Sequence, residues 1–260
     1  MIRRQLITAL IVVVVMTVGL GLVYPLVVTG VAQVAFHNKA NDSFVKVNGK
    51  VVGSKLLGQS FTDANGNPIA KYFQSRPSAA GSGYDASASS ASNLGPSNAN
   101  LIGNVPGVAV GSDGKPITSN PYATPADPYC VPVQATDKAG NDLTDKAGNP
   151  IYEKNNDGSY VCDPNTVPER VLAYRALNGL GPNVKVPVDA VTASASGLDP
   201  DISIANADLQ APRVAKVRHL PLATVLAEVS KHTEGRSLGV LGEKAVNVLE
   251  LNIALDQLGH

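Results

Sequence analysis

Side chains able to do covalent or acid–base chemistry are few in this sequence, and they do not cluster. The GxSxG pattern of a nucleophile elbow is missing. The histidines show neither the HExxH spacing of a zinc protease nor a nearby carboxylate cluster, so we interpret them as surface residues: His37, His219, His232 and His260. We therefore expect no catalytic centre and no bound metal.

A glycine-bounded segment, residues 53–60, has the spacing of a Walker A loop. Gln59 stands where that loop needs the lysine that reaches the β- and γ-phosphates. The segment also follows a predicted hairpin. We expect no nucleotide to bind there.

The two cysteines, Cys130 and Cys162, lie in a segment, residues 104–165, that is rich in Pro, Gly, Asn and Asp. Their spacing is not that of a CxxC redox or zinc site. In an exported protein one disulfide is the simplest interpretation, and it would stabilise the loop by about 3 kcal/mol. The sequence Asp-Lys-Ala-Gly-Asn occurs at 137–141 and again at 145–149, which predicts successive turns of a small β structure, with calcium binding as the lesser alternative.

A long apolar segment lies at the N-terminus, and its location decides where the rest of the chain lies. Residues 6–34 carry no charge, and about 20 helical residues cross a bilayer. The apolar region of a cleaved signal peptide, about 7–15 residues, is too short to match. Arg3 and Arg4 precede the segment, whereas Lys39 and Asp42 nearly cancel after it. We predict a single-pass anchor at 1–36, a cytoplasmic N-terminus and an extracytoplasmic domain at 37–260.

Small residues within the span predict how the helix packs. Pro25 lacks an N–H and its ring meets the carbonyl of Gly21, which predicts a kink. Thr17 and Gly21 form a small-xxx-small pair, and Gly30 adds another small surface. Such surfaces admit a neighbouring helix, although lipid also tolerates small residues.

The exported part shows strand patterns first and helical patterns later. Asn48-Gly49 between β-branched runs predicts a hairpin over 44–52. Short strands are predicted at 72–73, 186–193 and 246–250. Helices are predicted from 167, from a Ser203 cap to Gln210 with Pro212 opening the next segment, over 222–229 and over 251–258. We predict an α+β domain with a β- and turn-rich insert at about 104–165. The formal net charge of zero argues against nucleic-acid binding.

Several runs together are similar to one bacterial family. They occur in the family's order over about 1–103 and 166–260 and are Tyr24-Pro25-Leu26, Gly58-Gln59-Ser60-Phe61, Tyr72-Phe73-Gln74-Ser75-Arg76-Pro77, Ser92-Asn93-Leu94-Gly95-Pro96-Ser97-Asn98, Gly197-Leu198-Asp199-Pro200, Pro212-Arg213-Val214-Ala215, His232-Thr233-Glu234-Gly235-Arg236 and Val246-Asn247-Val248-Leu249-Glu250-Leu251-Asn252. They resemble KdpC, the C subunit of the Kdp potassium-transporting P-type ATPase. Residues 104–165 look like an insertion relative to it.

The resemblance implies an accessory, non-catalytic subunit of a bacterial inner-membrane complex, needed for assembly and activity. Its partners would be a channel-like potassium-binding subunit and a P-type ATPase subunit, which handle potassium and ATP, so no cofactor is expected on this chain. The family is often assigned the role of a catalytic chaperone that raises ATP affinity. Gln210 matches a glutamine proposed for that role, whereas its position alone indicates an exposed helix residue near a proline break.

Our topology prediction conflicts with direct contact to ATP, so we expect any effect on ATP to act through helix packing. A short tether would instead hold the domain near the outer mouth of the channel-like subunit, where it could guard potassium entry. The alternative function is a membrane-anchored periplasmic enzyme or assembly factor unrelated to potassium.

Overall fold

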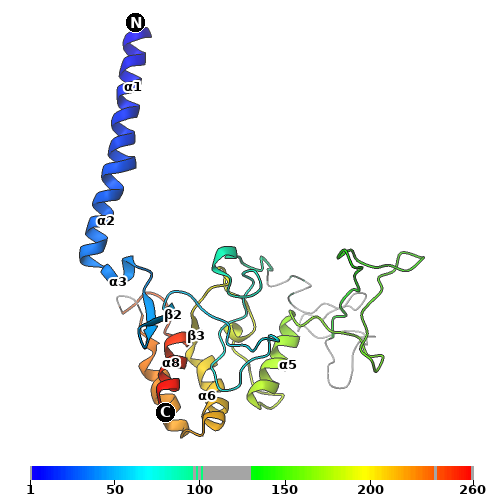
Figure 1. The fold of residues 1–260 in the computed structure, drawn as a ribbon. Helices are drawn as coiled ribbons and strands as arrows, with labels where there is room; N and C mark the ends of the chain where they lie inside the picture. Colours follow the sequence, from blue (N-terminus) through cyan, green and yellow to red (C-terminus); the bar gives the residue numbers. More distant parts are fainter. Residues whose placement is uncertain (1, 96–97, 99–100, 102–129, 237–238, 259–260) are drawn as a thin grey trace. The chain divides into compact units, whose positions relative to one another are not determined.

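The computed structural model describes residues 2–95, 98, 101, 130–236 and 239–258. The chain divides into two compact units, Met1–Leu56 and Leu57–His260. The first unit contains the apolar segment and the predicted hairpin, and the second contains the core of the soluble domain (Figure 1). Much of the first half of the predicted insert, residues 102–129, lies outside the described residues.

The apolar segment forms a continuous 34-residue helical stretch, Ile2–Ala35, and is long and apolar enough to cross a membrane. At 1.5 Å per residue it extends about 51 Å, longer than the roughly 30 Å hydrocarbon core. It consists of α1 (Ile2–Val18), a π-helical segment (Gly19–Val23) and α2 (Tyr24–Ala35). None of its helical residues is buried by the chain itself.

The π-helical segment lies directly before the proline that we expected to disturb the helix. The Tyr24 N–H donates to the Gly19 carbonyl, five residues back, immediately before Pro25. A wider turn accommodates a residue that cannot donate to the carbonyl four residues back and whose ring crowds it. The local disturbance at Pro25 is therefore a change of hydrogen-bond pattern.

A short helix, α3 (His37–Ala40), leads from the long helix into the predicted hairpin. Its strands are β1 (Phe44–Val47) and β2 (Lys50–Ser54), which pair antiparallel with an irregularity between Val45 and Lys46. Asn48 and Gly49 both have positive φ, 51° and 77°, as a type I′ turn requires. The hairpin prediction is confirmed.

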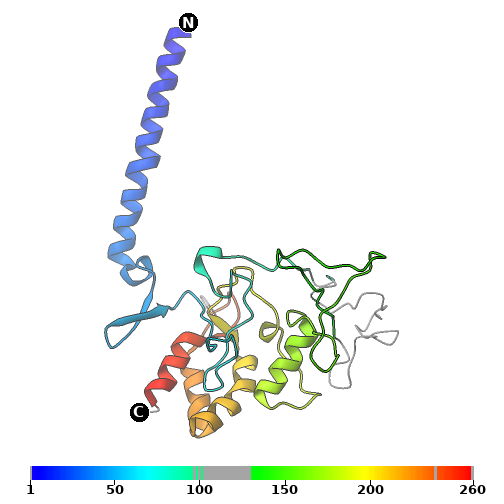
Figure 2. The same cartoon turned by 45° about the vertical axis from the view of Figure 1, so that its right-hand side comes forward.

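The second unit combines a small sheet with helices. Three antiparallel strands, β3 (Asp201–Ser203), β5 (Ala245–Asn247) and β4 (Thr233–Glu234), pair in that order. Its helices are α5 (Val167–Asn178), α6 (Ile204–Arg218), α7 (Leu222–Lys231) and α8 (Val248–Leu258). Both views show α5 beside α6 and the later helices gathered around the sheet (Figure 1 and Figure 2). The α+β prediction is confirmed.

The hydrophobic core of this unit is built from the sheet and the inner faces of α6, α7 and α8. Its buried side chains include Ile202, Val214, Val225, Val246, Leu251 and Leu255. One aromatic ring from outside these elements, that of Phe73, packs among them. Phe73 is fully buried. The segment that carries it is therefore fixed to the core although it is not a strand.

Four predicted elements differ in the structure. Residues 72–73 and 186–193 form no strand, and the latter contains only a 3₁₀ turn, Val188–Ala190. Strand β5 ends at Asn247, and α8 already begins at Val248. Helix α6 begins after the predicted Ser203 cap but passes through Pro212 instead of ending before it.

Within the described part of the insert, residues 130–165, one tight turn occurs three times. The first residue of each turn donates its N–H to the carbonyl four residues on, at Asp137, Asp145 and Asn155. The fourth residue of each turn is a glycine with positive φ. The predicted turns are confirmed, and the same turn also occurs at 63–67, outside the insert.

Backbone hydrogen bonds around the three turns of the insert form two closed rings. The N–H of Ala135 donates to Ile151, that of Ile151 to Leu143, and that of Leu143 back to Ala135, at 2.8–3.1 Å. Val133, Val161 and Glu153 form a second ring in the same way. Each ring satisfies three donors and three acceptors without a regular sheet, which explains how so polar a segment holds one conformation.

Candidate functional site

The residue that the resemblance singled out, Gln210, lies at the centre of a buried polar network. It is 1% exposed, so the expectation of an exposed helix residue is wrong. Its Oε1 accepts from the Gln74 N–H (2.7 Å) and from Arg213 Nη2 (2.9 Å), and its Nε2 donates to the Gln74 carbonyl (3.1 Å) and to Asn206 Oδ1 (2.9 Å). A carboxamide makes about four such bonds in total. Gln210 thus has no donor or acceptor left for a ligand.

Two side-chain amides take the place of neighbouring strands for the segment at 73–74. Gln210 of α6 exchanges two hydrogen bonds with the backbone of Gln74. Asn252 of α8 does the same with Phe73, through its Oδ1 (2.9 Å) and Nδ2 (3.0 Å). Successive residues of an extended chain point their polar groups to opposite sides, so the segment is held between two helices. This explains why residues predicted as a strand pair with no strand.

A buried cation completes the network one turn after Gln210. Arg213 is 8% exposed. Its guanidinium donates to the carbonyls of Ala70 and Tyr72 and to the side-chain oxygens of Gln210 and Asn178. All of these acceptors are neutral, and burial lowers the pKa of Arg213 to about 10. The group stays charged at neutral pH and ties the 70–74 segment to α5 and α6.

A carboxylate anchors the other end of the network. Asp189 accepts from the Ser203 N–H (2.8 Å), the Ser203 hydroxyl (2.9 Å) and Asn206 Nδ2 (3.0 Å), at the start of α6. The Tyr174 hydroxyl of α5 donates to Asn206 Oδ1 (2.8 Å). Burial, and then the charge of Asp189, raise the pKa of Tyr174. The phenol therefore stays protonated as a donor.

A cavity of about 280 Å³ adjoins the network. Its walls include Gln74, Tyr174, Asn206 and Gln210 together with the hydroxyls and arginines of neighbouring segments: Ser60, Thr62, Ser75, Arg76, Ser78, Tyr84 and Arg170. Arg76 pairs with Asp199 at 3.0 Å. Among the described residues, no group of three or more His, Cys, Asp or Glu side chains gathers to hold a metal ion. The arrangement positions backbone segments and shows no nucleophile beside a base.

Sequence reasoning found Gln210 but missed most of its partners. Asn206, Gln210 and Arg213 follow a spacing of four and three residues, which places them on one face of α6. That polar stripe, one turn after the Ser203 cap, was the available signal. Arg213 also lies in the quoted Pro212-Arg213-Val214-Ala215 run. Asn252 of α8 belongs to another quoted run and gave no separate signal.

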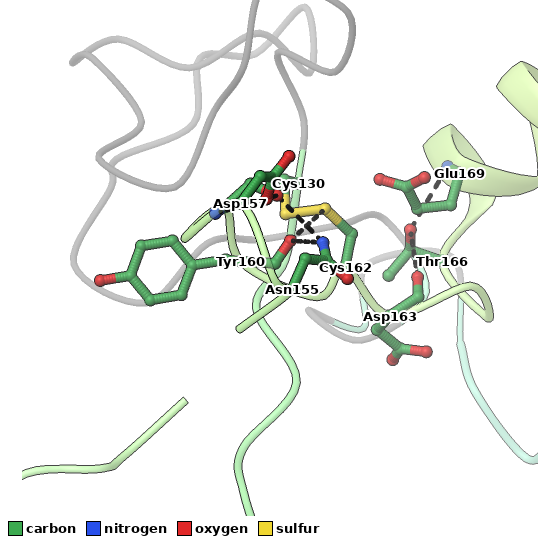
Figure 3. The surroundings of a disulfide bond; sticks show 9 residues. Cys130, Asn155, Asp157, Tyr160, Cys162, Asp163, Thr166 and Glu169 are labelled. Carbon is green, nitrogen blue, oxygen red and sulfur yellow. Dashed lines mark hydrogen bonds between the residues drawn. A yellow bond between two sulfur atoms is a disulfide. The ribbon is translucent and has the colours of Figure 1, made fainter. Parts of the chain in front are cut away.

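The two cysteines close the base of the insert. Cys130 and Cys162 are joined in a disulfide, with their Cα atoms 5.1 Å apart (Figure 3). The adjoining chain enters α5 through Thr166, whose hydroxyl accepts from the Glu169 N–H and donates to the Asp163 carbonyl, each at 3.4 Å. The disulfide therefore fixes the end of the insert close to the start of α5.

The small residues of the long helix were predicted to face another helix. The Thr17 methyl lies 4.0 Å from where a Cβ on Gly21 would stand, so the two share one face. A Cβ added to Gly30 would meet no described atom within 4 Å. Nothing in the described part of the chain covers these positions.

Comparisons with known proteins place the chain in a family. A family model described as "KdpC: K+-transporting ATPase, c chain" matches residues 6–129 and 161–257. The potassium-transporting ATPase KdpC subunit of Mycobacterium bovis (strain BCG / Pasteur 1173P2) is 42% identical over 256 residues, 98% of this chain and 100% of the relative. The subunit of that name from Acidobacterium capsulatum is 40% identical over 251 residues, 96% and 97% of the two chains. The one from Caulobacter vibrioides is 42% identical over 241 residues, which are 92% of this chain and 86% of the relative.

The chain therefore belongs to the KdpC family, whose members are subunits of the K+-transporting ATPase and not its catalytic chain. This favours the first of our two functional interpretations over an unrelated membrane-anchored enzyme. The family model leaves residues 130–160 unmatched, whereas the mycobacterial relative aligns with 98% of the chain. The segment that the family model leaves unmatched lies within the predicted insert at 104–165 and is shorter than it, because the model matches residues 104–129 and 161–165.

Proposed function

We propose that this member of the KdpC family helps to hold the potassium-transporting ATPase together through its anchor, residues 1–36, and carries an extracytoplasmic domain at 37–260. The observation that carries the proposal is the helix Ile2–Ala35, none of whose helical residues is buried by its own chain. A helix that packs on nothing of its own is available to the channel-like and ATPase subunits. The proposed contact face contains Thr17 and Gly21, next to the π-helical turn before Pro25, and Gly30 adds another small surface.

Two features support an outward orientation of the soluble domain in the bacterial cell membrane. Arg3 and Arg4 directly precede the uncharged span, as expected for a cytoplasmic end. The Cys130–Cys162 disulfide is typical of proteins that fold in an oxidising compartment. Four lysines also follow the span within 20 residues, so the disulfide is the stronger support of the two.

The proposal makes any effect on ATP indirect. Gln210, the residue implied for a catalytic-chaperone role, is buried and spends all its hydrogen-bonding capacity inside the domain. A domain outside the membrane does not meet cytoplasmic ATP. We infer that ATP affinity responds to how the anchor helix packs, and that the partner subunits bind both ATP and potassium.

A second role, guarding the outer entrance for potassium, is favoured by one observation on the loop 78–100. Hydrogen bonds from the Ser87 hydroxyl and N–H lower the pKa of Asp85, which keeps its carboxylate ionised. An anionic loop near a channel mouth attracts cations. Substitutions at Asp85, Asn93 and Asn98 in assembled complexes should then change the apparent potassium affinity. Unchanged affinity and selectivity in all of them would exclude this role.

The assembly role is tested by adding bulk to the proposed helix face. We expect Gly21→Leu to lower severalfold the amount of both partner subunits that co-purify with the chain in mild detergent, because the new side chain separates the two backbones. Leu20→Ile, at the neighbouring position, is the matched control and should leave the yield unchanged. Wild-type yields for both Gly21→Leu and Gly30→Leu would show that this face does not carry assembly.

A further inference from the structure

The segment after the membrane helix is tied to the end of that helix by side-chain hydrogen bonds. The amides of Gln33 and Asn41 bond reciprocally, at 3.3 and 3.0 Å, and Asn41 also donates to the His37 carbonyl at 2.6 Å. The Ser54 hydroxyl, at the end of the hairpin, donates to the Asp42 carbonyl at 2.6 Å. All these residues belong to the same compact unit, Met1–Leu56. The hairpin is therefore held close to the end of the span.

The distance from the bilayer is short for every residue of the hairpin. The helix of about 51 Å exceeds even the roughly 40–45 Å bilayer with its headgroups. With Arg3 and Arg4 at one surface, the other end of the helix reaches the outer edge of the opposite headgroup layer, and the usual tilt of a membrane helix brings it into that layer. Phe44 follows Ala35, the last residue of α2, by only nine positions, and those include the α3 turn. The hairpin thus begins at the headgroup layer.

The same segment is basic. Lys39, Lys46, Lys50 and Lys55 fall within 20 residues of the end of the helix, against the single acid Asp42. The first three are exposed, and none of those three makes an ion pair with a described carboxylate. Their exposed ammonium groups are available to an anionic partner.

Exposed apolar side chains alternate with these lysines on the hairpin. Lys46 pairs with Val51 across the strands, and Phe44 lies two residues before Lys46 on the same face. Phe44 is 53% exposed and Val51 is 52% exposed. We call these three residues the hairpin face. A lysine between two exposed apolar groups suits the boundary where acyl chains meet headgroups, because its stem stays in apolar surroundings while its ammonium reaches outward.

We propose that the hairpin face is an interfacial lipid-binding surface. Phe44 and Val51 insert among the upper acyl chains, and Lys46 between them binds the phosphates of anionic phospholipids. The covalent and hydrogen-bonded continuity with the membrane helix favours lipid over a protein as the occupant. The proposed function decides only which leaflet is bound, so failure of this test leaves the assembly role untouched.

The chain contains no tryptophan, so one introduced indole reports its own surroundings. The full chain carrying Phe44→Trp or Val51→Trp is reconstituted in vesicles of phosphatidylcholine with brominated acyl chains, alone or mixed equally with phosphatidylglycerol. Val217→Trp and Val188→Trp, at exposed valines of the other compact unit, are the controls. We expect at least about twofold stronger quenching by bromine at positions 44 and 51 than at the controls.

Lys46 is tested on the Phe44→Trp background. Lys46→Glu should at least halve the quenching in the phosphatidylglycerol mixture and leave it unchanged in phosphatidylcholine alone. Lys46→Arg retains the charge and should retain the quenching. High salt should act like the charge reversal.

Three results would overturn the proposal. Quenching at positions 44 and 51 no stronger than at the controls would mean that the hairpin face stays out of the bilayer. Quenching that changes neither with the substitution of Lys46 nor with the charge of the lipid would exclude phosphate recognition. Quenching in the chain alone that disappears in the assembled complex would mean that a partner subunit covers the face.

Discussion

Replacing Gln210 by alanine separates a structural role of this residue from a direct role in ATP binding. The substitution removes four hydrogen bonds at once. It leaves these partners without Gln210: the N–H and the carbonyl of Gln74, Nη2 of Arg213 and Oδ1 of Asn206. Each buried group left unpaired costs about 1–3 kcal/mol. Asn206 Oδ1 keeps the Tyr174 hydroxyl as a donor, so its loss is partial.

The magnitude depends on how far water replaces the lost carboxamide. The cavity borders Gln74, Asn206 and Gln210, so water can reach part of the network. We therefore use the lower end of the range and predict a loss of about 3 kcal/mol in the free energy of unfolding. That is a large share of the roughly 5–15 kcal/mol of an ordinary domain. With an ordinary urea dependence it moves the midpoint by about 1.5 M.

The assay is proteolysis of the full chain across a urea series in mild detergent, where cleavage of the soluble domain reports its unfolding. Gln257→Ala is the matched control, because Gln257 is an exposed glutamine on α8. Complexes that still assemble with Gln210→Ala should keep the wild-type ATP affinity. A urea midpoint of Gln210→Ala equal to that of Gln257→Ala would refute the structural role. So would a fall in ATP affinity without a fall in the free energy of unfolding.

Three further predictions test the insert, a close contact and a buried phenol. Changing Cys130 and Cys162 together to serine should destabilise the insert by about 3 kcal/mol and speed cleavage within 130–163 while partner co-purification persists; loss of the complex would make the insert integral to assembly. Gly58→Ala places a methyl group into the Tyr84 ring and should cost at least about 2 kcal/mol, whereas Gly95→Ala, whose methyl group meets no described atom within 4 Å, should stay within about 0.5 kcal/mol in the same urea series. Burial raises the pKa of Tyr84 to about 12, so up to about 3 kcal/mol of stability, fully present below pH 10, should be lost as pH rises toward 12; an identical alkaline profile for Tyr84→Phe would contradict this.

Local patterns predicted the elements whose cause is local. An uncharged run of apolar residues forms a helix whatever follows it, and Asn48-Gly49 forms its turn because both residues tolerate positive φ. Ser203 caps α6 through the Asn206 N–H at 3.1 Å, as its type predicts. In these cases neighbours in sequence decide the structure.

The failures arise where distant residues decide. Residues 72–73 have the composition of a strand, but the side chains of Gln210 and Asn252 supply the pairing for 73–74 from two helices. Pro212 did not end α6 because it lies on the exposed side of the helix. The carbonyl that it leaves unpaired, on the exposed residue Asp208, meets solvent there. No periodicity in the sequence reports either circumstance.

The candidate site was predicted only as one position. The resemblance pointed to Gln210, but its four bonds depend on residues up to 136 positions away. The disulfide was predictable because only two cysteines exist, whereas the closed backbone rings beside it were not, since each ring joins residues from three separate segments of the chain.

The side of the membrane on which the soluble domain lies tests the account most directly, because both an indirect effect on ATP and a role at the outer entrance for potassium depend on it. Alkaline phosphatase fused after His260 is active only when exported, and a cytoplasm-only reporter fused at the same position is its complement. We predict an active phosphatase and a silent cytoplasmic reporter in cells that assemble the complex. A silent phosphatase with an active cytoplasmic reporter would place the domain beside ATP and contradict the account.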